Sequence, residues 1–241
     1  MKKLLMILAA LIFSGCAVHT AQTIDSDQLE KNVWKLVGVS TEQAPTIEFS
    51  KDKVWGFNGV NQFNANYTIN NGSFALSNMV NTLKAAIDPK LTELESNFNK
   101  VLTTASRLTL DDQTVVIEST NGSLQFEKVD FDLILSGQWE LVSVGLVMVN
   151  ERDRNKPFVS FNGGTITGHS GINHIRATYT LDGKNIQISP LIGTKMAGRE
   201  SAMELEKQFL SALQSATTIT AANATSLKIN SANAGLTFKR K

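Results

Sequence analysis

Cysteine is almost absent from this chain, with Cys16 the only one among 241 residues. An exported protein normally uses cysteines in pairs or avoids them, because a lone exposed thiol is reactive in an oxidising compartment. The sequence therefore excludes a fold built on disulfides. It also leaves Cys16 in need of a separate explanation.

An excess of charge of either sign is also missing. The chain has 23 Lys and Arg against 22 Asp and Glu, and only 7% of its residues are aromatic. Without Lys2 and Lys3 the balance becomes 21 against 22, a net charge of about −1. This composition does not steer the chain toward nucleic acid or toward an acidic substrate. We expect no nucleic-acid partner.

The only long hydrophobic run is too short to cross a membrane. It covers residues 4–13 and follows Met1-Lys2-Lys3. Ten residues in a helix span about 15 Å, roughly half of a bilayer core. A basic start followed by a short apolar run is typical of a secretory signal peptide.

The end of this segment accounts for the lone cysteine. Phe13-Ser14-Gly15-Cys16 resembles the lipobox of bacterial lipoproteins, although Phe13 replaces the usual leucine. The resemblance implies a signal peptide at 1–15, lipid attachment at Cys16 and acyl chains such as palmitate that anchor the chain in a membrane. Because Ala17 follows rather than aspartate, it implies the outer membrane, with the chain facing the periplasm. The alternative is an ordinary signal peptide cut elsewhere.

The second half of the chain repeats the first at a distance of about 110 residues, which is long enough for a domain with its own core. Trp34-Lys-Leu-Val returns as Trp139-Glu-Leu-Val, and Gly56-Phe-Asn-Gly-Val-Asn61 returns as Gly168-His-Ser-Gly-Ile-Asn173. We predict a polar tether at 16–32, a first domain at 33–128, a linker at 129–137 and a second domain at 138–241. The linker is apolar enough to pack between the domains.

Each repeat is predicted to be a small α+β domain, an antiparallel sheet or partial barrel with one amphipathic helix. Turn pairs such as Asn71-Gly72 and Asp182-Gly183 separate short β-rich segments. One segment per repeat has the apolar stripe of an amphipathic helix, and this stripe must pack against an apolar face of the sheet. In the first repeat the N-cap is Asp88 and Pro89 follows it. The stripe residues are Leu91, Leu94, Phe98, Val101 and Leu102, with counterparts Ala202, Leu205, Phe209 and Leu213.

The repeats differ most between their first two predicted strands. Trp139 lies 105 residues after Trp34, but Phe161 lies 112 after Phe49, so the second repeat has seven extra residues within 145–157. This enlarged loop is a candidate contact for a partner protein, and an inert surface insertion is the alternative. Trp55 is a second candidate, because its counterpart is Thr167. The charged loop candidates are Glu151, Arg152, Asp153 and Arg154.

Both repeats are similar to the META domain, or HslJ-like, family. The similarity is carried by Ser170-Gly-Ile-Asn173, Thr194-Lys-Met-Ala-Gly198 and the helix that begins near Glu204, with a more divergent copy in the first repeat. The family pattern has a cysteine at each of two places, where this chain has Val60 and Ala86, then Ile172 and Gly198. The resemblance therefore implies an apolar contact in place of a covalent one. It also implies a bacterial envelope protein, in some members linked to heat or antibiotic stress.

Catalytic and metal-binding motifs are scarce. His169 and His174 are five residues apart and are expected to point to opposite faces of a strand, with no third ligand evident. The pairs Glu93/Glu95 and Glu204/Glu206 are expected to begin helices, where acids favour the dipole. No polar constellation is expected to recur in both repeats. We expect no catalytic residues, no metal and no cofactor.

The function predicted from these features is non-enzymatic binding of another envelope protein. Two alternatives stay open. One is a carrier in which each curled sheet holds a small apolar molecule, and a cavity lined by Trp55 or Phe57 would favour it. The other is a hydrolase built on the histidines with Glu151 and Asp153.

Overall fold

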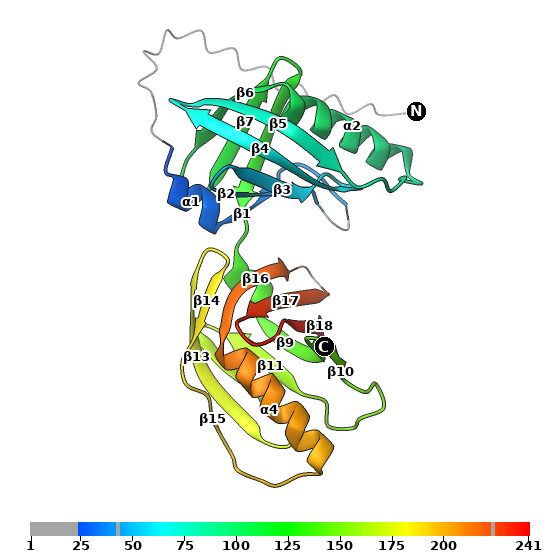
Figure 1. Ribbon diagram of the computed structural model, residues 1–241, viewed down its shortest axis with the longest axis vertical. Helices are drawn as coiled ribbons and strands as arrows, with labels where there is room; N and C mark the ends of the chain where they lie inside the picture. Colours follow the sequence, from blue (N-terminus) through cyan, green and yellow to red (C-terminus); the bar gives the residue numbers. More distant parts are fainter. Residues whose placement is uncertain (1–23, 42–43, 223–224) are drawn as a thin grey trace, which may run out of the picture.

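The computed structural model describes residues 24–41, 44–222 and 225–241. It contains two β domains stacked along the long axis of the molecule and joined by one connection (Figure 1). The first domain lies at the top of the view and the second at the bottom. Cys16 lies outside the described residues.

The first domain is a closed antiparallel barrel of eight strands, and β1 pairs with both β2 and β8 to close it. The predicted hairpin at Asn71-Gly72 forms, with φ of 49° and 80° at these two residues. The strands are β1 Val33–Leu36, β2 Thr46–Ser50, β3 Lys53–Phe57, β4 Gln62–Asn70, β5 Ser73–Asn81, β6 Ala105–Leu110, β7 Thr114–Ser119 and β8 Gly122–Lys128.

The second domain repeats this arrangement with a looser closure. Its sheet runs β10-β9-β18-β17-β16-β14-β13-β12-β11, and β15 pairs with β13. The Leu141 amide donates to the Pro157 carbonyl at 2.9 Å. The Leu36 amide makes the equivalent bond to the Pro45 carbonyl, also at 2.9 Å, in the first domain. The strands are β9 Gly137–Val144, β10 Val147–Met148, β11 Phe158–Asn162, β12 Thr165–His169, β13 His174–Asp182, β14 Asn185–Ile188, β15 Ile192–Gly193, β16 Ala216–Ala222, β17 Ser226–Ser231 and β18 Leu236–Arg240.

One long helix packs against each barrel, α2 at Pro89–Thr103 and α4 at Glu200–Gln214. The side chain of Asp88 accepts from the Lys90 amide at 2.9 Å and caps α2, as predicted. The expectation that Glu93/Glu95 and Glu204/Glu206 begin their helices is wrong. Helix α2 begins at Pro89 and its first turn contains no acid, and α4 begins at Glu200, the only acid of its first turn. Glu95 instead lies in the second turn, where it takes part in the buried contacts described below.

One short helix precedes the first strand of each domain: α1 at Ser26–Lys31 in the first and α3 at Phe131–Leu135 in the second. The indole of Trp34 donates to the Leu29 carbonyl at 3.0 Å, and the indole of Trp139 donates to the Leu135 carbonyl at 2.7 Å. Residues 26–31 of the predicted tether and residues 131–135 of the predicted linker therefore belong to the folded domains. Leu29, Phe131 and Leu135 are buried.

Each barrel interior is filled by its own side chains. Phe49, Tyr67 and Phe74 pack together in the first domain, with the Phe49 and Tyr67 rings edge to face at 5.3 Å. Phe161 and Tyr179 repeat this contact at 5.3 Å in the second. These rings occupy the space in which the carrier hypothesis placed a ligand inside each sheet. Residues matched between the repeats are buried in both, as one fold used twice requires: Trp34 and Trp139, Tyr67 and Tyr179, Phe98 and Phe209, Phe126 and Phe238.

Within residues 24–41, 44–222 and 225–241, the structure has no helix that is both long enough and apolar enough to span a bilayer.

Candidate partner-binding sites

A polar constellation recurs in both domains, so the expectation that none would recur is wrong. In the first domain, the Asn61 amide group joins the turn after β3 to helix α2 and to the loop after β5. Its nitrogen donates to Glu95 Oε1 at 2.7 Å and to the Lys84 carbonyl at 3.0 Å. Its oxygen accepts from the Thr82 hydroxyl and from the Lys84 amide, both at 2.7 Å. Asn61 is 4% exposed, so these bonds are shielded from water.

The second domain makes the same bonds with Asn173. Its nitrogen donates to Glu206 Oε1 at 2.9 Å and to the Met196 carbonyl at 3.2 Å. Its oxygen accepts from the Thr194 hydroxyl and the Met196 amide, both at 2.7 Å. We call these two sets the Asn–Glu clusters: Asn58, Asn61, Thr82, Lys84 and Glu95 in the first domain, Ser170, Asn173, Thr194, Met196 and Glu206 in the second.

Asn58 and Ser170 occupy the same place in the two clusters and make equivalent hydrogen bonds, although they are different residue types. Asn58 Oδ1 accepts from the Asn61 amide at 2.7 Å, and Ser170 Oγ accepts from the Asn173 amide at 2.9 Å. Asn58 Nδ2 donates to Glu95 at 3.1 Å, and the Ser170 hydroxyl donates to Glu206. Among the described residues, no buried side-chain nitrogen or oxygen of these clusters lacks a hydrogen-bond partner, which is what burial requires. The clusters therefore hold the fold together and set the position of the loop before each helix.

The apolar contact implied by family resemblance is present in the second domain. A Cβ added to Gly198 would lie 2.6 Å from Cδ1 of Ile172, so these two residues are in contact, and a larger residue at 198 would require the end of the Ile172 side chain to shift. The matching contact of Val60 with Ala86 stays a prediction.

The histidines do not point to opposite faces, contrary to expectation. His169 ends β12, His174 begins β13, and the two are direct cross-strand partners. Their rings are 5.0 Å apart, because a hairpin turn returns the chain to the same face. The Gly171 amide donates to Nδ1 of His169 at 3.0 Å. Nδ1 accepts this bond, so it carries no proton and the proton of the neutral ring lies on Nε2. A metal bound at Nε2 would require the proton on Nδ1 instead, which this hydrogen bond disfavours.

Burial lowers the pKa of His169, and the nearby charge of His174 lowers it further. Among the described residues, no group of three or more His, Cys, Asp or Glu side chains could hold a metal ion. The described contacts join Glu151 to Lys239, not to either histidine.

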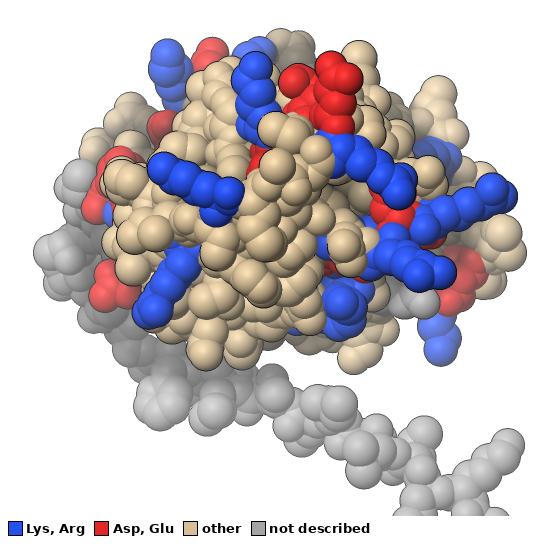
Figure 2. Space-filling model, turned by 90° about the horizontal axis from the view of Figure 1, so that it is seen from below, with Lys and Arg blue, Asp and Glu red and all other residues tan. Residues whose placement is uncertain are grey.

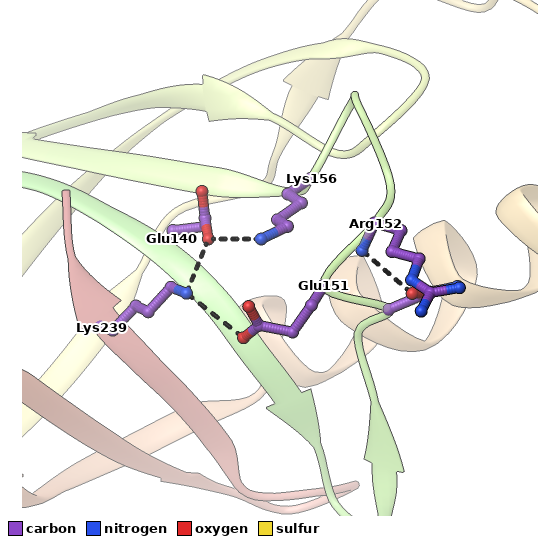
Figure 3. Close-up of polar contacts among 6 residues, drawn as sticks. Glu140, Glu151, Arg152, Lys156 and Lys239 are labelled. Carbon is purple, nitrogen blue, oxygen red and sulfur yellow. Dashed lines mark hydrogen bonds and ion pairs between the residues drawn. The ribbon is translucent and has the colours of Figure 1, made fainter.

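The enlarged loop of the second domain has a fixed base (Figure 3). Glu140 pairs with Lys156 at 3.2 Å and with Lys239 at 3.3 Å, and Lys239 also reaches Glu151 at 3.4 Å. Burial alone would raise the pKa of Glu140, but hydrogen bonds from the two lysines outweigh burial and lower it. Asn150 holds the turn by accepting from the Arg152 amide at 3.0 Å.

Beyond that base, the loop exposes apolar side chains. β10 pairs with β9 in a hairpin that has no counterpart among the described residues of the first domain. Leu146 at its tip is 101% exposed and Met148 is 67% exposed. Arg152, Asp153 and Arg154 follow, and all three are exposed. The loop thus combines an uncovered apolar tip with a charged border.

Trp55 lies on the outer face of the first barrel, half-buried, in a groove between the domains. The groove has a volume of about 810 Å³ and is also lined by Phe57, Leu133, Ile134 and Ile219. Lys184 reaches Trp55 from the second domain, with Nζ 5.3 Å from the ring centre, and pairs with Glu48 at 2.7 Å. The sequence suggested Trp55 only through its mismatch with Thr167. Nothing in the sequence signalled Lys184.

Two tandem antiparallel barrel-like domains define the class of this protein. Each has a short helix before its first strand and a long helix before its last three strands. The chain belongs to the META domain family, whose sequence model matches residues 27–130 and again 132–241. Each match begins at the short helix of its domain.

Several solved structures resemble parts of the chain. One, an NMR structure, is 19% identical and covers 44% of this chain and 95% of its own, with a TM-score of 0.39. An NMR structure of a protein from Burkholderia xenovorans is 16% identical and covers 49% and 99%, with a TM-score of 0.37. A DUF4847 family protein from Bacteroides vulgatus is 19% identical and covers 46% and 96%, with a TM-score of 0.33. Among curated proteins, none matches the chain.

Proposed function

We propose that this META domain protein is a lipid-anchored envelope protein that binds another envelope protein and catalyses no reaction. In this proposal Cys16 carries the anchor, the outer membrane holds it, and the two domains face the periplasm. The support for the anchor is the lone cysteine after a signal-like segment. The support for a binding role is the segment 145–157 of the second domain.

The exposed tip of that segment carries the proposal. Leu146 and Met148 are among the most exposed large apolar residues of the described chain, at 101% and 67%. An apolar centre with a polar border is the usual anatomy of a protein interface. The salt bridges of Glu140 and Lys239 hold the base of the loop, so little conformational freedom would be lost on binding.

Crosslinking in intact cells tests this role. A photoreactive residue at Leu146 should capture a specific protein, and Arg152→Glu with Arg154→Glu should abolish the capture. The melting temperature should stay unchanged, because exposed loop charges contribute little to stability. Lys228→Glu, an exposed reversal on β17, is the matched control and should keep the partner. Capture that survives the double reversal would show that the loop charges are not part of the site.

The mass of the mature protein tests the anchor separately. The chain should begin at Cys16 and carry acyl additions, and Cys16→Ser should release folded protein from the membrane. An unmodified chain that begins elsewhere would contradict the anchor and leave the binding role standing.

A second candidate function is binding of a small apolar ligand in the groove between the domains. The observation that favours it is the lining, because Trp55 and Phe57 both face this space of about 810 Å³. The barrel interiors are filled, so a ligand would bind outside them. Trp34 and Trp139 are fully buried, so a change in indole fluorescence on ligand addition would come mainly from Trp55. Trp55→Thr, which copies Thr167, should remove it.

A further inference from the structure

The loop between sheet and long helix exposes apolar side chains in both domains. Each loop is fixed at its start by an Asn–Glu cluster, through Thr82 in the first domain and Thr194 in the second. Beside these anchors, Leu83 is 99% and Ile87 101% exposed, while Ile192 is 73% and Met196 54% exposed. Two copies that differ in sequence here both present uncovered apolar groups. The exposed residues differ in position between the copies, but the same loop carries them in each domain, and grouped exposed apolar side chains often mark a binding surface.

The loop of the second domain is also basic. Residues 189–199 contain Lys195 and Arg199 and no acid, and both side chains are exposed. The nearest acids along the chain are Glu200, in the first turn of α4, and Glu204, which accepts from Gln208. The loop of the first domain is balanced, because Asp88 follows Lys84.

Arg199 occupies a position that is unfavourable for the helix. It is the N-cap of α4 and makes no side-chain capping bond, whereas its counterpart Asp88 caps α2. A cation there adds to the positive end of the helix dipole, and the cap bond is lost. A residue that breaks a local rule with no structural gain points to a functional demand.

Figure 2 views the molecule from this end, where the segment between β15 and α4 lies at the bottom of Figure 1. A broad uncharged area fills the centre of the face, and Lys and Arg side chains project around it. Some acidic side chains also lie at the border. The exposed side chains of Ile192 and Met196, with the cations of Lys195 and Arg199 close to them in the chain, suit a surface that is anionic outside and apolar beneath. An anionic lipid membrane has this profile.

We propose that the β15–α4 segment docks on an anionic lipid surface. Ile192 and Met196 enter the boundary between headgroups and acyl chains, and Lys195 and Arg199 contact lipid phosphates. This attachment is separate from acylation at Cys16 and from the segment 145–157. Its test therefore uses residues 24–241, which hold both barrels with their cores and contain no cysteine.

An environment-sensitive dye on Met196→Cys reports insertion directly. The expected result is a blue shift with phosphatidylglycerol vesicles and none with phosphatidylcholine vesicles. The matched control is Leu83→Cys, on the equivalent loop in the other domain, which is more exposed but has balanced charge. It should show no shift. Equal shifts at both positions would mean unselective adsorption and would overturn the proposal.

Substitutions separate charge from fold. Arg199→Asp copies the cap of the first domain, so it should raise the melting temperature, yet lower vesicle binding by at least tenfold, since each charge contributes about fivefold. Ile192→Ser with Met196→Ser should lower binding by about tenfold or more. Undiminished binding of Arg199→Asp would overturn the proposal. So would a dye shift that grows with protein concentration without vesicles, which would indicate a second copy as the occupant.

Discussion

One amide group organises the loop end of each domain. The Asn173 side chain has two donor and two acceptor positions, and all four are used within the second domain. Its partners lie in the loop before α4 and in α4 itself, more than 20 residues away along the chain. Asn61 does the same in the first domain. A single residue type therefore fixes three segments in each barrel.

Removing this amide should be strongly destabilising. Asn173→Ala removes one of the two hydrogen bonds to Glu206, which keeps its bond from Ser170. It also leaves the Met196 amide and carbonyl without their partner in a shielded site, and each such group costs about 1–3 kcal/mol. We expect a loss of about 2–4 kcal/mol in the free energy of unfolding, measured by denaturant titration. Asn64→Ala, at an exposed position on β4, should change stability by less than about 0.5 kcal/mol. Similar losses for both variants would mean that the bonds are unimportant.

His169 should make stability fall in mild acid. Burial lowers its pKa in the folded state, so the unfolded chain binds the proton first as pH falls. Stability is then complete above the ordinary pKa of 6.5 and is lost as pH falls below it, down to the lowered folded value. Protonation would also remove the acceptor of the Gly171 amide. The melting temperature should therefore drop between about pH 7.5 and pH 5.

His169→Phe copies Phe57 of the first domain and is the control for this effect. It should flatten the dependence of melting temperature on pH across the same range. A variant with the slope of the parent protein would assign the acid sensitivity to other groups.

Some residue-level features could not be predicted from the sequence. The recurrence of Asn61 with Asn173 and of Glu95 with Glu206 was visible, but 34 and 33 residues separate the partners and spacing does not say which side chains meet. The histidine prediction failed because alternation holds along one strand, not across a turn. Predicting which residues pair across two strands requires the position of the turn that joins them.

The long helices carry much of each core. Phe209 is fully buried in α4 and lies edge to face with Phe238, at 6.3 Å between ring centres. Phe209→Ala should cost about 3–5 kcal/mol, which is enough to unfold a marginal domain. Circular dichroism and calorimetry should show early loss of the second domain. Met203→Ala, at 46% exposure on the same helix, is the control and should have a small effect.

At the scale of elements, local signals succeeded where they were strong. Asp88, Pro89 and the apolar stripe predicted α2 correctly, and turn residues predicted the hairpin at Asn71-Gly72. The short helices α1 and α3 were missed, because five or six residues are too few for a periodic signal. β10 was also missed. Its two residues pair only because the insertion folds back on β9.

At the scale of the whole molecule, one hairpin tip touches the other domain. The turn between β13 and β14 reaches α1, where the Lys184 amide donates to the Lys31 carbonyl at 2.9 Å and Asp182 pairs with Lys31 at 3.0 Å. The pair of Lys184 with Glu48 is well shielded, at 16% and 18% side-chain exposure. These contacts set the width of the groove that contains Trp55.

Gly183 makes this contact possible, so its replacement should separate the domains. A Cβ on Gly183 would lie 2.2 Å from the Lys31 carbonyl oxygen, and its φ of +60° already disfavours other residues. Gly183→Ala should therefore break the bonds of Lys184 to the first domain while both barrels stay folded. Small-angle scattering should show a larger radius of gyration, and the Lys184 amide should exchange faster with solvent.

Gly163→Ala distinguishes this separation from simple backbone strain. Gly163 lies in the same domain with φ of +51°, and nothing lies within 4 Å of an added Cβ. Alanine costs about 1–2 kcal/mol at either position through its left-handed conformation. Only Gly183→Ala should change the scattering curve and expose Trp55, seen as a red shift in indole emission. If the two variants behave alike, contacts other than this hairpin tip hold the domains in place.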